Sequence, residues 1–146
     1  MNDSKHVDQM TEQIRLSYAH LIKNYMQLCN KYKQFKNKVS VNGEEIKTII
    51  SFIDLYLYDE IGKINWNNLF PLMPLNIEQN IKQEYGILSE NEVKLCCLLL
   101  FNVSCNDITN ILPYTQNSVH SITHKIKQKT EMKDIIESLK KLLLLE

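Results

Sequence analysis

The polar side chains that follow Thr115 are the residues of this chain whose types and spacing best suit hydrogen bonds and charge contacts with a polar ligand. Glutamine and asparagine amides can form two hydrogen bonds with adenine, and lysine can contact guanine or a phosphate group. No acidic residue occurs between Asp107 and Glu131, whereas three lysines fall in that interval. Such a stretch could neutralise a few phosphates in each subunit, so its affinity for nucleic acid would depend on salt. The candidate contact residues are Gln116, Asn117, His120, Thr123, His124, Lys125, Lys127 and Lys129.

Two other interpretations of these residues have to be weighed. Lysines on one helix often do no more than keep a surface helix solvated. His120 and His124 lie one helical turn apart, as the histidines of some zinc sites do, but no H-E-x-x-H pattern or third ligand accompanies them. We therefore predict neither a metal nor a cofactor.

Three hydroxyl residues predict where the helices around these side chains begin. Ser89 is followed three residues later by Glu92, which is the capping-box pattern of a helix start. Ser104 and Thr115 mark two further starts. Two helices joined by about four residues, the second amphipathic and basic, form a helix-turn-helix, the unit that many proteins insert into the major groove of DNA.

The apolar residues of the same region predict a common core. They recur at spacings of three and four, so one side of each helix would be buried while the candidate contact residues stay outside. The predicted core residues are Leu95, Leu98, Leu99, Ile108, Ile111, Leu112, Val119, Ile122 and Ile126.

The segment LSENEVKLCCLLLFNVSCNDITNILPYTQNSVHSITHKIKQKT, residues 88–130, resembles the LuxR/GerE-type helix-turn-helix. This module is found at the C-terminus of bacterial transcriptional regulators, which often contain tetratricopeptide repeats. The resemblance implies a four-helix domain that binds double-stranded DNA, with dimerisation through the fourth helix. It is carried without gaps by Leu88, Ser89, Glu92, Ser104, Asp107, Ile108, Thr115, Ser118 and Val119.

The segment departs from the family pattern at four positions. Asn102 replaces a glycine, and asparagine is the next best residue for the left-handed backbone that closes a helix. Asn106 replaces a lysine near the phosphate backbone, and Thr109 replaces a small alanine at a helix contact. Thr123 stands where the most similar group carries arginine. The last three changes reduce the contacts expected with DNA or between helices.

A last amphipathic helix is predicted over residues 133–145. Its apolar side is larger than so small a domain can easily cover, so, together with the resemblance, it leads us to expect a homodimer. The apolar residues are Ile135, Ile136, Leu139, Leu142 and Leu143.

A long first helix is predicted over residues 7–38. Its apolar and tyrosine residues alternate at steps of three and four, a period that fits either a coiled-coil seam or a core stripe packed on the next helix of the same chain. This predicted seam consists of Val7, Thr11, Ile14, Tyr18, Leu21, Tyr25, Leu28, Tyr32 and Phe35.

Further helices are predicted between this helix and Gly86. One begins at Glu44 and ends at Gly62, and a third stretch around Trp66 is broken by two prolines. We place a domain boundary near Gly86, between a helical interaction or oligomerisation region, residues 1–86, and a helix-turn-helix domain, residues 87–146. The inner face of the second helix is predicted to consist of Ile46, Ile49, Ile50, Ile53 and Leu57.

Composition narrows the class of protein. Three glycines, three prolines and no alternating strand pattern predict an all-α fold. Seventeen basic and seventeen acidic residues leave no net charge, so only local charge can support binding to nucleic acid. The four cysteines lack C-x-x-C spacing, and no membrane-spanning run or signal peptide is visible, which favours reduced thiols and a cytoplasmic location.

Two classes of function stay open, and catalysis is not one of them. The chain shows no Gly-rich phosphate loop and no nucleophile and base at recognisable spacing, so we expect no enzyme and no small-molecule substrate. The first class is a dimeric DNA-binding transcriptional regulator. The alternative is a helical protein-protein interaction module with a degenerate helix-turn-helix, which would bind through the tyrosine seam or the Leu-rich end.

Overall fold

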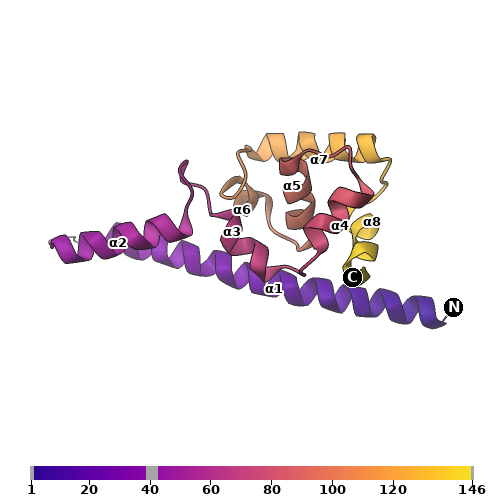
Figure 1. Cartoon of the computed structure of the whole chain (residues 1–146), viewed down its shortest axis with the longest axis horizontal. Coiled ribbons are helices and arrows are strands. Elements are labelled where there is room, and N and C mark those ends of the chain that lie inside the picture. The colour runs from indigo at the N-terminus through magenta and orange to yellow at the C-terminus, as the bar shows by residue number, and fades with distance from the viewer. Residues whose placement is uncertain (1, 39–42, 146) are drawn as a thin grey trace.

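The computed structural model describes residues 2–38 and 43–145, and this part of the chain is all-helical, as predicted (Figure 1). Within these residues the β contact is limited to an isolated antiparallel bridge between Tyr58 and Ile64. None of the described helices has the length and apolar character that crossing a membrane requires. The elements are α1 (Asn2–Lys38), α2 (Glu44–Leu57), α3 (Trp66–Leu69), η1 (Phe70–Leu72), α4 (Ile77–Glu84), α5 (Glu90–Leu100), α6 (Cys105–Thr109), α7 (Gln116–Thr130), α8 (Ile135–Lys140) and η2 (Lys141–Leu144).

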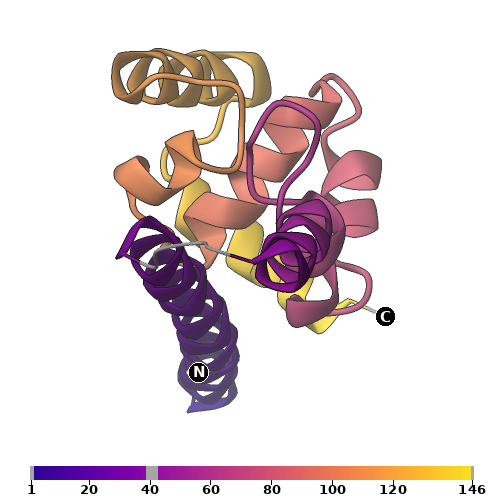
Figure 2. The same cartoon turned by 90° about the vertical axis from the view of Figure 1, so that its left-hand side faces the viewer.

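The long helix α1 and the candidate contact helix α7 lie on opposite sides of the molecule. In Figure 1, α1 runs along the bottom and α7 along the top, with α4, α5, α6 and α8 between them; Figure 2, turned by 90°, again shows α1 at the lower side and α7 at the upper side. The helix α2 runs back beside the C-terminal part of α1. This arrangement leaves the outer side of α7 free of the other elements described in residues 2–38 and 43–145.

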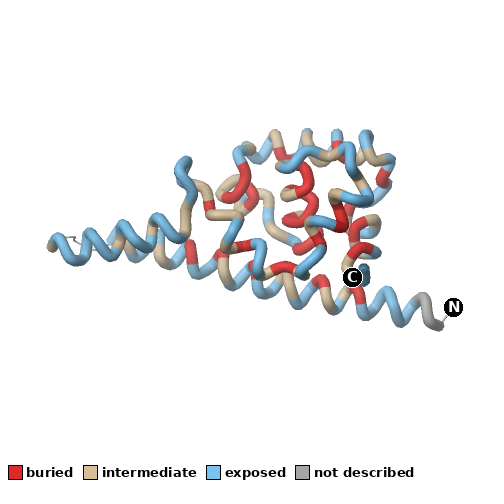
Figure 3. The backbone as a smooth tube through the Cα atoms, in the orientation of Figure 1, coloured by how far each residue is buried: buried red, intermediate tan, exposed pale blue. Residues whose placement is uncertain are grey.

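A shared hydrophobic core holds these helices together. Figure 3 shows the buried residues concentrated on α5 and on the sides of its neighbours that face it. Residues 95–98 of α5 are fully buried. The core also contains Ile22 from α1 and Ile81 from α4, so residues on both sides of Gly86 contribute to it. The helix-turn-helix therefore packs as part of a larger unit that includes α1 and α4.

The predicted seam of α1 is only partly buried. Leu21, Leu28 and Phe35 are exposed, and the buried side chains in this half of the helix are instead Ile22, Met26 and Cys29. The predicted seam was centred about one residue too early: the buried side runs through Arg15, Ile22 and Cys29, each one position after a predicted seam residue. The seam tyrosines Tyr18, Tyr25 and Tyr32 lie half-buried at the border between the two sides.

The helix α2 ends earlier than predicted. It ends at Leu57 rather than Gly62, because Tyr58 leaves the helix and pairs with Ile64. Gly62 lies in the turn between these two residues, where its φ of +82° is in the left-handed region that glycine adopts readily. Its role is to turn the chain rather than to close the helix.

The predicted inner face of α2 is only partly correct. No residue of α2 is fully buried; Ile50 and Leu57 are half-buried, and Leu57 packs against the core. The side that meets α1 is partly polar: Asp54 accepts hydrogen bonds from Tyr32 at 2.8 Å and from Lys36 at 2.7 Å. The other three predicted residues, Ile46, Ile49 and Ile53, are exposed.

The apolar side of the last helix is covered within the chain, contrary to the prediction. Ile135, Leu139 and Leu142 are buried, and α8 and η2 pack against α1, α4 and α5. The prediction considered residues 87–146 alone, whereas α1 and α4 supply the missing partner surface. The residues predicted for a dimer contact through this helix are therefore largely used inside one chain.

Candidate nucleic-acid interface

The three predicted helix caps all form. In the capping box of α5, the Ser89 N–H donates to Glu92 Oε1 at 2.9 Å, and the Glu92 N–H donates to Ser89 Oγ at 3.2 Å. Ser104 and Thr115 each accept a hydrogen bond from the backbone N–H three residues later, at 3.1 Å. These bonds satisfy N–H groups that a helix start leaves unpaired, and they set where α5, α6 and α7 begin.

Asn102 adopts the predicted backbone conformation, and α7 turns its apolar side toward the core. Asn102 has a φ of +59°, the left-handed conformation that its sequence position predicts. On α7, Val119 is 3% exposed and Ile126 is fully buried, while Ile122 packs half-buried against the same core. The opposite side of α7 therefore faces solvent, as the amphipathic pattern predicts.

Most of the candidate contact residues lie on this exposed side, but they do not form one row. At roughly 100° per residue, Gln116, His120 and Lys127 lie toward one edge of the exposed side, and Lys125 lies toward the other. The structure thus brings the first three together and separates them from Lys125. The exposed candidates are Gln116, Asn117, His120, His124, Lys125 and Lys129, while Thr123 and Lys127 are half-buried.

Thr123 turns toward its own helix. Its hydroxyl donates to the backbone carbonyl of Val119 at 2.7 Å, a bond that threonines commonly make with the preceding helical turn. The hydroxyl hydrogen of Thr123 is therefore used within α7, and the side chain is half-buried.

Lys129 forms an ion pair that its sequence neighbours did not indicate. Its ammonium nitrogen lies 3.0 Å from both carboxylate oxygens of Glu92 on α5. Burial by itself would raise the pKa of Glu92, but hydrogen bonds from Ser89 and Lys129 outweigh it and hold that pKa below its ordinary value. The carboxylate is therefore charged at neutral pH and neutralises Lys129. The positive charge of α7 is therefore lower than the absence of acids between Asp107 and Glu131 predicts.

Two exposed side chains of α7 were missing from the predicted set. Ser121 and Gln128 are exposed and, with Asn117 and His124, form the centre of the outer side at steps of four, three and four. The helical period that identified the buried residues also indicates these two, because Ser121 and Gln128 lie on the side of the helix opposite Val119 and Ile126.

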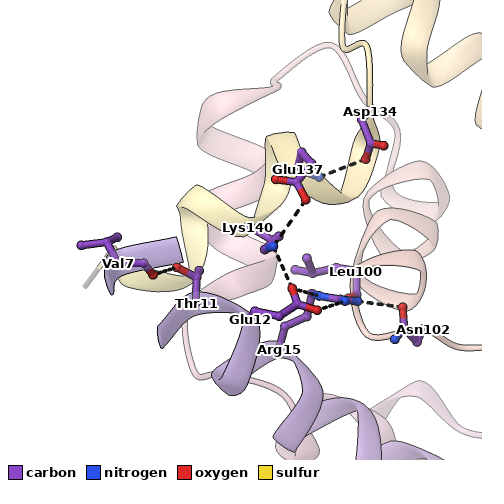
Figure 4. Close-up of polar contacts among 9 residues, drawn as sticks. All are labelled: Val7, Thr11, Glu12, Arg15, Leu100, Asn102, Asp134, Glu137 and Lys140. Atoms are coloured by element: carbon purple, nitrogen blue, oxygen red, sulfur yellow. Dashed lines mark hydrogen bonds and ion pairs between the residues drawn. The ribbon is translucent and has the colours of Figure 1, made fainter. Parts of the chain in front are cut away.

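A buried arginine of α1 connects the N-terminal helix to the helix-turn-helix (Figure 4). Arg15 Nη1 donates to the backbone carbonyl of Leu100 at 3.1 Å and to Asn102 Oδ1 at 2.7 Å. Arg15 also bonds the carboxylate of Glu12, which in turn lies 2.7 Å from Lys140 Nζ. The end of α5 and the left-handed turn after it are therefore held by α1. Neither Arg15 nor Glu12 belongs to a sequence motif that would predict this contact.

Acid is expected to weaken this connection. Hydrogen bonds from Arg15 and Lys140 lower the pKa of Glu12 from 4.5 to about 2. A carboxylate whose pKa is lower in the folded state stabilises the fold above its unfolded pKa and loses that contribution as pH falls through the folded pKa. We expect the urea midpoint to fall as the pH decreases from 4.5 to about 2, and to fall less in Glu12→Gln. An unchanged pH dependence in Glu12→Gln would contradict this assignment.

The described residues include no group of three His, Cys, Asp or Glu side chains that could hold a metal ion. Comparisons with protein-family models, with curated protein sequences and with solved structures find no match for this chain. Its function is therefore inferred from the residues and from their geometry.

Proposed function

We propose that this protein is a DNA-binding transcriptional regulator that acts as a homodimer and contacts double-stranded DNA through α6, the following turn and α7. The observation that carries the proposal is the position of α7. It lies at the edge of the molecule with Val119 and Ile126 buried and with amides, histidines and lysines in solvent. A helix held in this way can enter a major groove while its apolar side stays packed.

The exposed side of α7 offers both kinds of contact that DNA recognition requires. Gln116 and Asn117 carry amides that suit adenine, whereas Lys125 and Lys127 suit phosphate or guanine. Gln116 Nε2 lies 3.4 Å from Asn106 Oδ1, so the starts of α6 and α7 present one continuous polar surface. This surface combines base-reading amides with cations for the phosphate backbone.

The resemblance of residues 88–130 to the LuxR/GerE-type helix-turn-helix supports the proposal. Ser89, Ser104 and Thr115 begin helices at the positions that the pattern requires. The proposed role in transcription and the expectation of a dimer come from this resemblance, although the last helix, through which the resemblance implies pairing, has its apolar side covered within the chain. The proposed DNA contact also rests on the exposed side of α7.

Fluorescence anisotropy with labelled random-sequence duplex tests the proposal. The wild-type chain is expected to bind at micromolar concentration or tighter, with an affinity that falls steeply as salt increases. Lys127→Ala should weaken binding and reduce the slope of log affinity against log salt by about one. Lys129→Ala is the matched control, because Glu92 already neutralises this lysine, and it should leave the slope nearly unchanged.

No binding to duplex at low salt, or binding that does not respond to salt, would reject DNA contact by α7. Equal losses of duplex affinity in Lys127→Ala and Lys129→Ala would show that the ion pair with Glu92 does not keep Lys129 from contributing to binding. Selection of bound fragments from random duplex would add a consensus, which should be two-fold symmetric if a dimer binds.

The second candidate function is a helical protein-protein interaction module that keeps the helix-turn-helix fold without DNA affinity. The Glu92–Lys129 ion pair favours it, because this pair leaves α7 with less charge than its sequence suggests. A folded chain without salt-dependent duplex binding would support this candidate over the first.

A further inference from the structure

An apolar row on α1 is left uncovered by the rest of the described chain. Val7, Ile14, Leu21, Leu28 and Phe35 follow one another at intervals of seven residues, so each lies only about 20° around the helix from the previous one and together they form a slowly turning stripe. Val7 is 42% exposed, Leu21 48%, Leu28 64% and Phe35 58%, and Ile14 is half-buried. We call these five residues the outer row.

In the first half of α1, the outer row borders a groove. Met10, Ile14 and Leu21 line one side of it, and Pro74 and Leu143 line the other. The groove has a volume of about 660 Å³ and is open to solvent. It could therefore accept apolar side chains from another molecule without any rearrangement of the core.

In the second half of α1, the outer row continues beside α2. Lys33 of α1 and Ser51 and Leu55 of α2 line the same side of this antiparallel helix pair. Helical periodicity places Leu28 and Phe35 on the other side of the pair, together with three isoleucines of α2. These are Ile46, Ile49 and Ile53, which are 46%, 57% and 37% exposed. We call the outer row, Met10 and these isoleucines the outer-row surface.

The size of this surface matches what one partner buries in a stable dimer. Aromatic side chains bury about 150–250 Å² each and aliphatic ones less, so these nine side chains, at about 130 Å² each and about half exposure, offer roughly 600 Å². A standard interface buries about 800 Å² on each partner. Single exposed apolar residues need no partner, but a contiguous apolar surface of this size marks an interaction site.

The charges of α1 favour one orientation of a second copy. Residues 21–38 carry five lysines and no acid, whereas in residues 5–20 Asp8 and Glu12 balance Lys5 and Arg15. Parallel pairing would set two lysine-rich halves side by side, where like charges repel. Antiparallel pairing instead places each lysine-rich half beside the first half of the other helix.

We propose that the outer-row surface binds a second copy of this chain, with the two α1 helices antiparallel and a two-fold axis at Leu21. In this register Leu21 meets Leu21 of the partner subunit, and Ile14 meets Leu28 of the partner subunit. Val7 meets Phe35 of the partner subunit. Because of the two-fold symmetry, the Ile14–Leu28 and Val7–Phe35 contacts each form twice, so every residue of the outer row has a partner.

The orientation has a geometric consequence for α7. The two-fold axis of an antiparallel pair is perpendicular to the plane of the two α1 helices, so both copies place α7 on the same side of that plane. A parallel pair, with its axis along the helices, would place the two α7 helices on opposite sides. Only this consequence rests on the proposed function, because one duplex could then contact both copies; the pairing itself does not require DNA.

Analytical ultracentrifugation without DNA tests the surface. The wild-type chain is expected to be dimeric at micromolar concentration, and Leu21→Glu is expected to be monomeric. Leu16→Glu is the matched control: Leu16 is 47% exposed on the same helix but lies roughly 140° around it from Leu21, and this variant should remain dimeric. Circular dichroism confirms that both variants stay helical, so loss of the dimer is not loss of the fold.

Crosslinking with a short bismaleimide tests the register. The background variant is Cys105→Ser, because the other three cysteines are buried. In the antiparallel register Leu21→Cys crosslinks with itself, while Ile14→Cys and Leu28→Cys crosslink efficiently only when mixed. Self-crosslinking of Ile14→Cys alone would indicate parallel pairing and overturn the orientation.

Other outcomes overturn the surface itself. A wild-type chain that stays monomeric at every concentration would do so, and so would a dimer unaffected by Leu21→Glu. A monomer that binds vesicles containing an anionic lipid would assign the surface to a membrane instead. Because these measurements contain no DNA, a failure here would leave the proposed DNA contact by α7 untouched, and a failure of duplex binding would leave the pairing of α1 untouched.

Discussion

Replacing Arg15 with alanine is expected to lower the free energy of unfolding by about 2–3 kcal/mol, because several charge-assisted hydrogen bonds disappear at a buried site. The substitution leaves the Leu100 carbonyl and the Asn102 side chain without their donor. It also leaves Lys140 as the remaining ion-pair partner of Glu12. Urea unfolding followed by circular dichroism measures the change.

Two further variants separate this network from general effects of charge. Lys23→Ala removes an exposed cation from the same helix and should change stability by no more than about 0.5 kcal/mol. Arg15→Lys keeps the charge but has one donor nitrogen where Arg15 donates from three separate nitrogens, so its stability should lie between those of the wild type and Arg15→Ala. Equal stability of Arg15→Ala and Lys23→Ala would show that α1 is not anchored to α5 in this way.

Ile126→Ala is expected to destabilise the protein by about 2–4 kcal/mol, because it removes fully buried methyl groups and leaves a cavity. Ile126 is fully buried on the side of α7 that faces the core. The same substitution should weaken DNA binding under conditions where part of the chain is unfolded, since α7 is held in place by this contact. Thermal and urea unfolding give the stability change.

The neighbouring Lys125 provides the control. Lys125 is exposed, so Lys125→Ala should leave stability within about 0.5 kcal/mol of the wild type while it weakens salt-dependent duplex binding. The two adjacent substitutions would thus separate the buried and exposed sides of α7. A neutral Ile126→Ala, with a strongly destabilising Lys125→Ala, would mean that the helix is rotated from the position described above.

Local structure around the candidate interface could be predicted from the sequence. The starts of α5, α6 and α7 followed from Ser89, Ser104 and Thr115, and the left-handed turn followed from Asn102. These features depend on hydrogen bonds and backbone preferences within a few residues, which the local sequence contains in full. The buried side of α7 followed for the same reason from the helical period of its apolar residues.

Contacts between distant segments could not be predicted in this way. Lys129 meets Glu92 across 37 positions, and Arg15 meets Asn102 across 87. Nothing in the spacing of nearby residues indicates such a pair, because it exists only once the helices have packed. The true charge of α7 and the anchoring of α1 therefore emerged only from the folded chain.

The amino-acid order by itself determined the helical class, the caps and the two-sided character of α7, since each arises from short-range bonding and helical periodicity. The tertiary structure alone decided which apolar faces stay free. Packing of α1 and α4 covered Leu139 and Leu142 of the last helix, yet left Leu21 and Leu28 of α1 in solvent. The physical reason is that a face is buried only when a second surface packs on it. A periodic apolar pattern shows that a helix has an apolar face, but it does not show which other segment covers that face or whether any does.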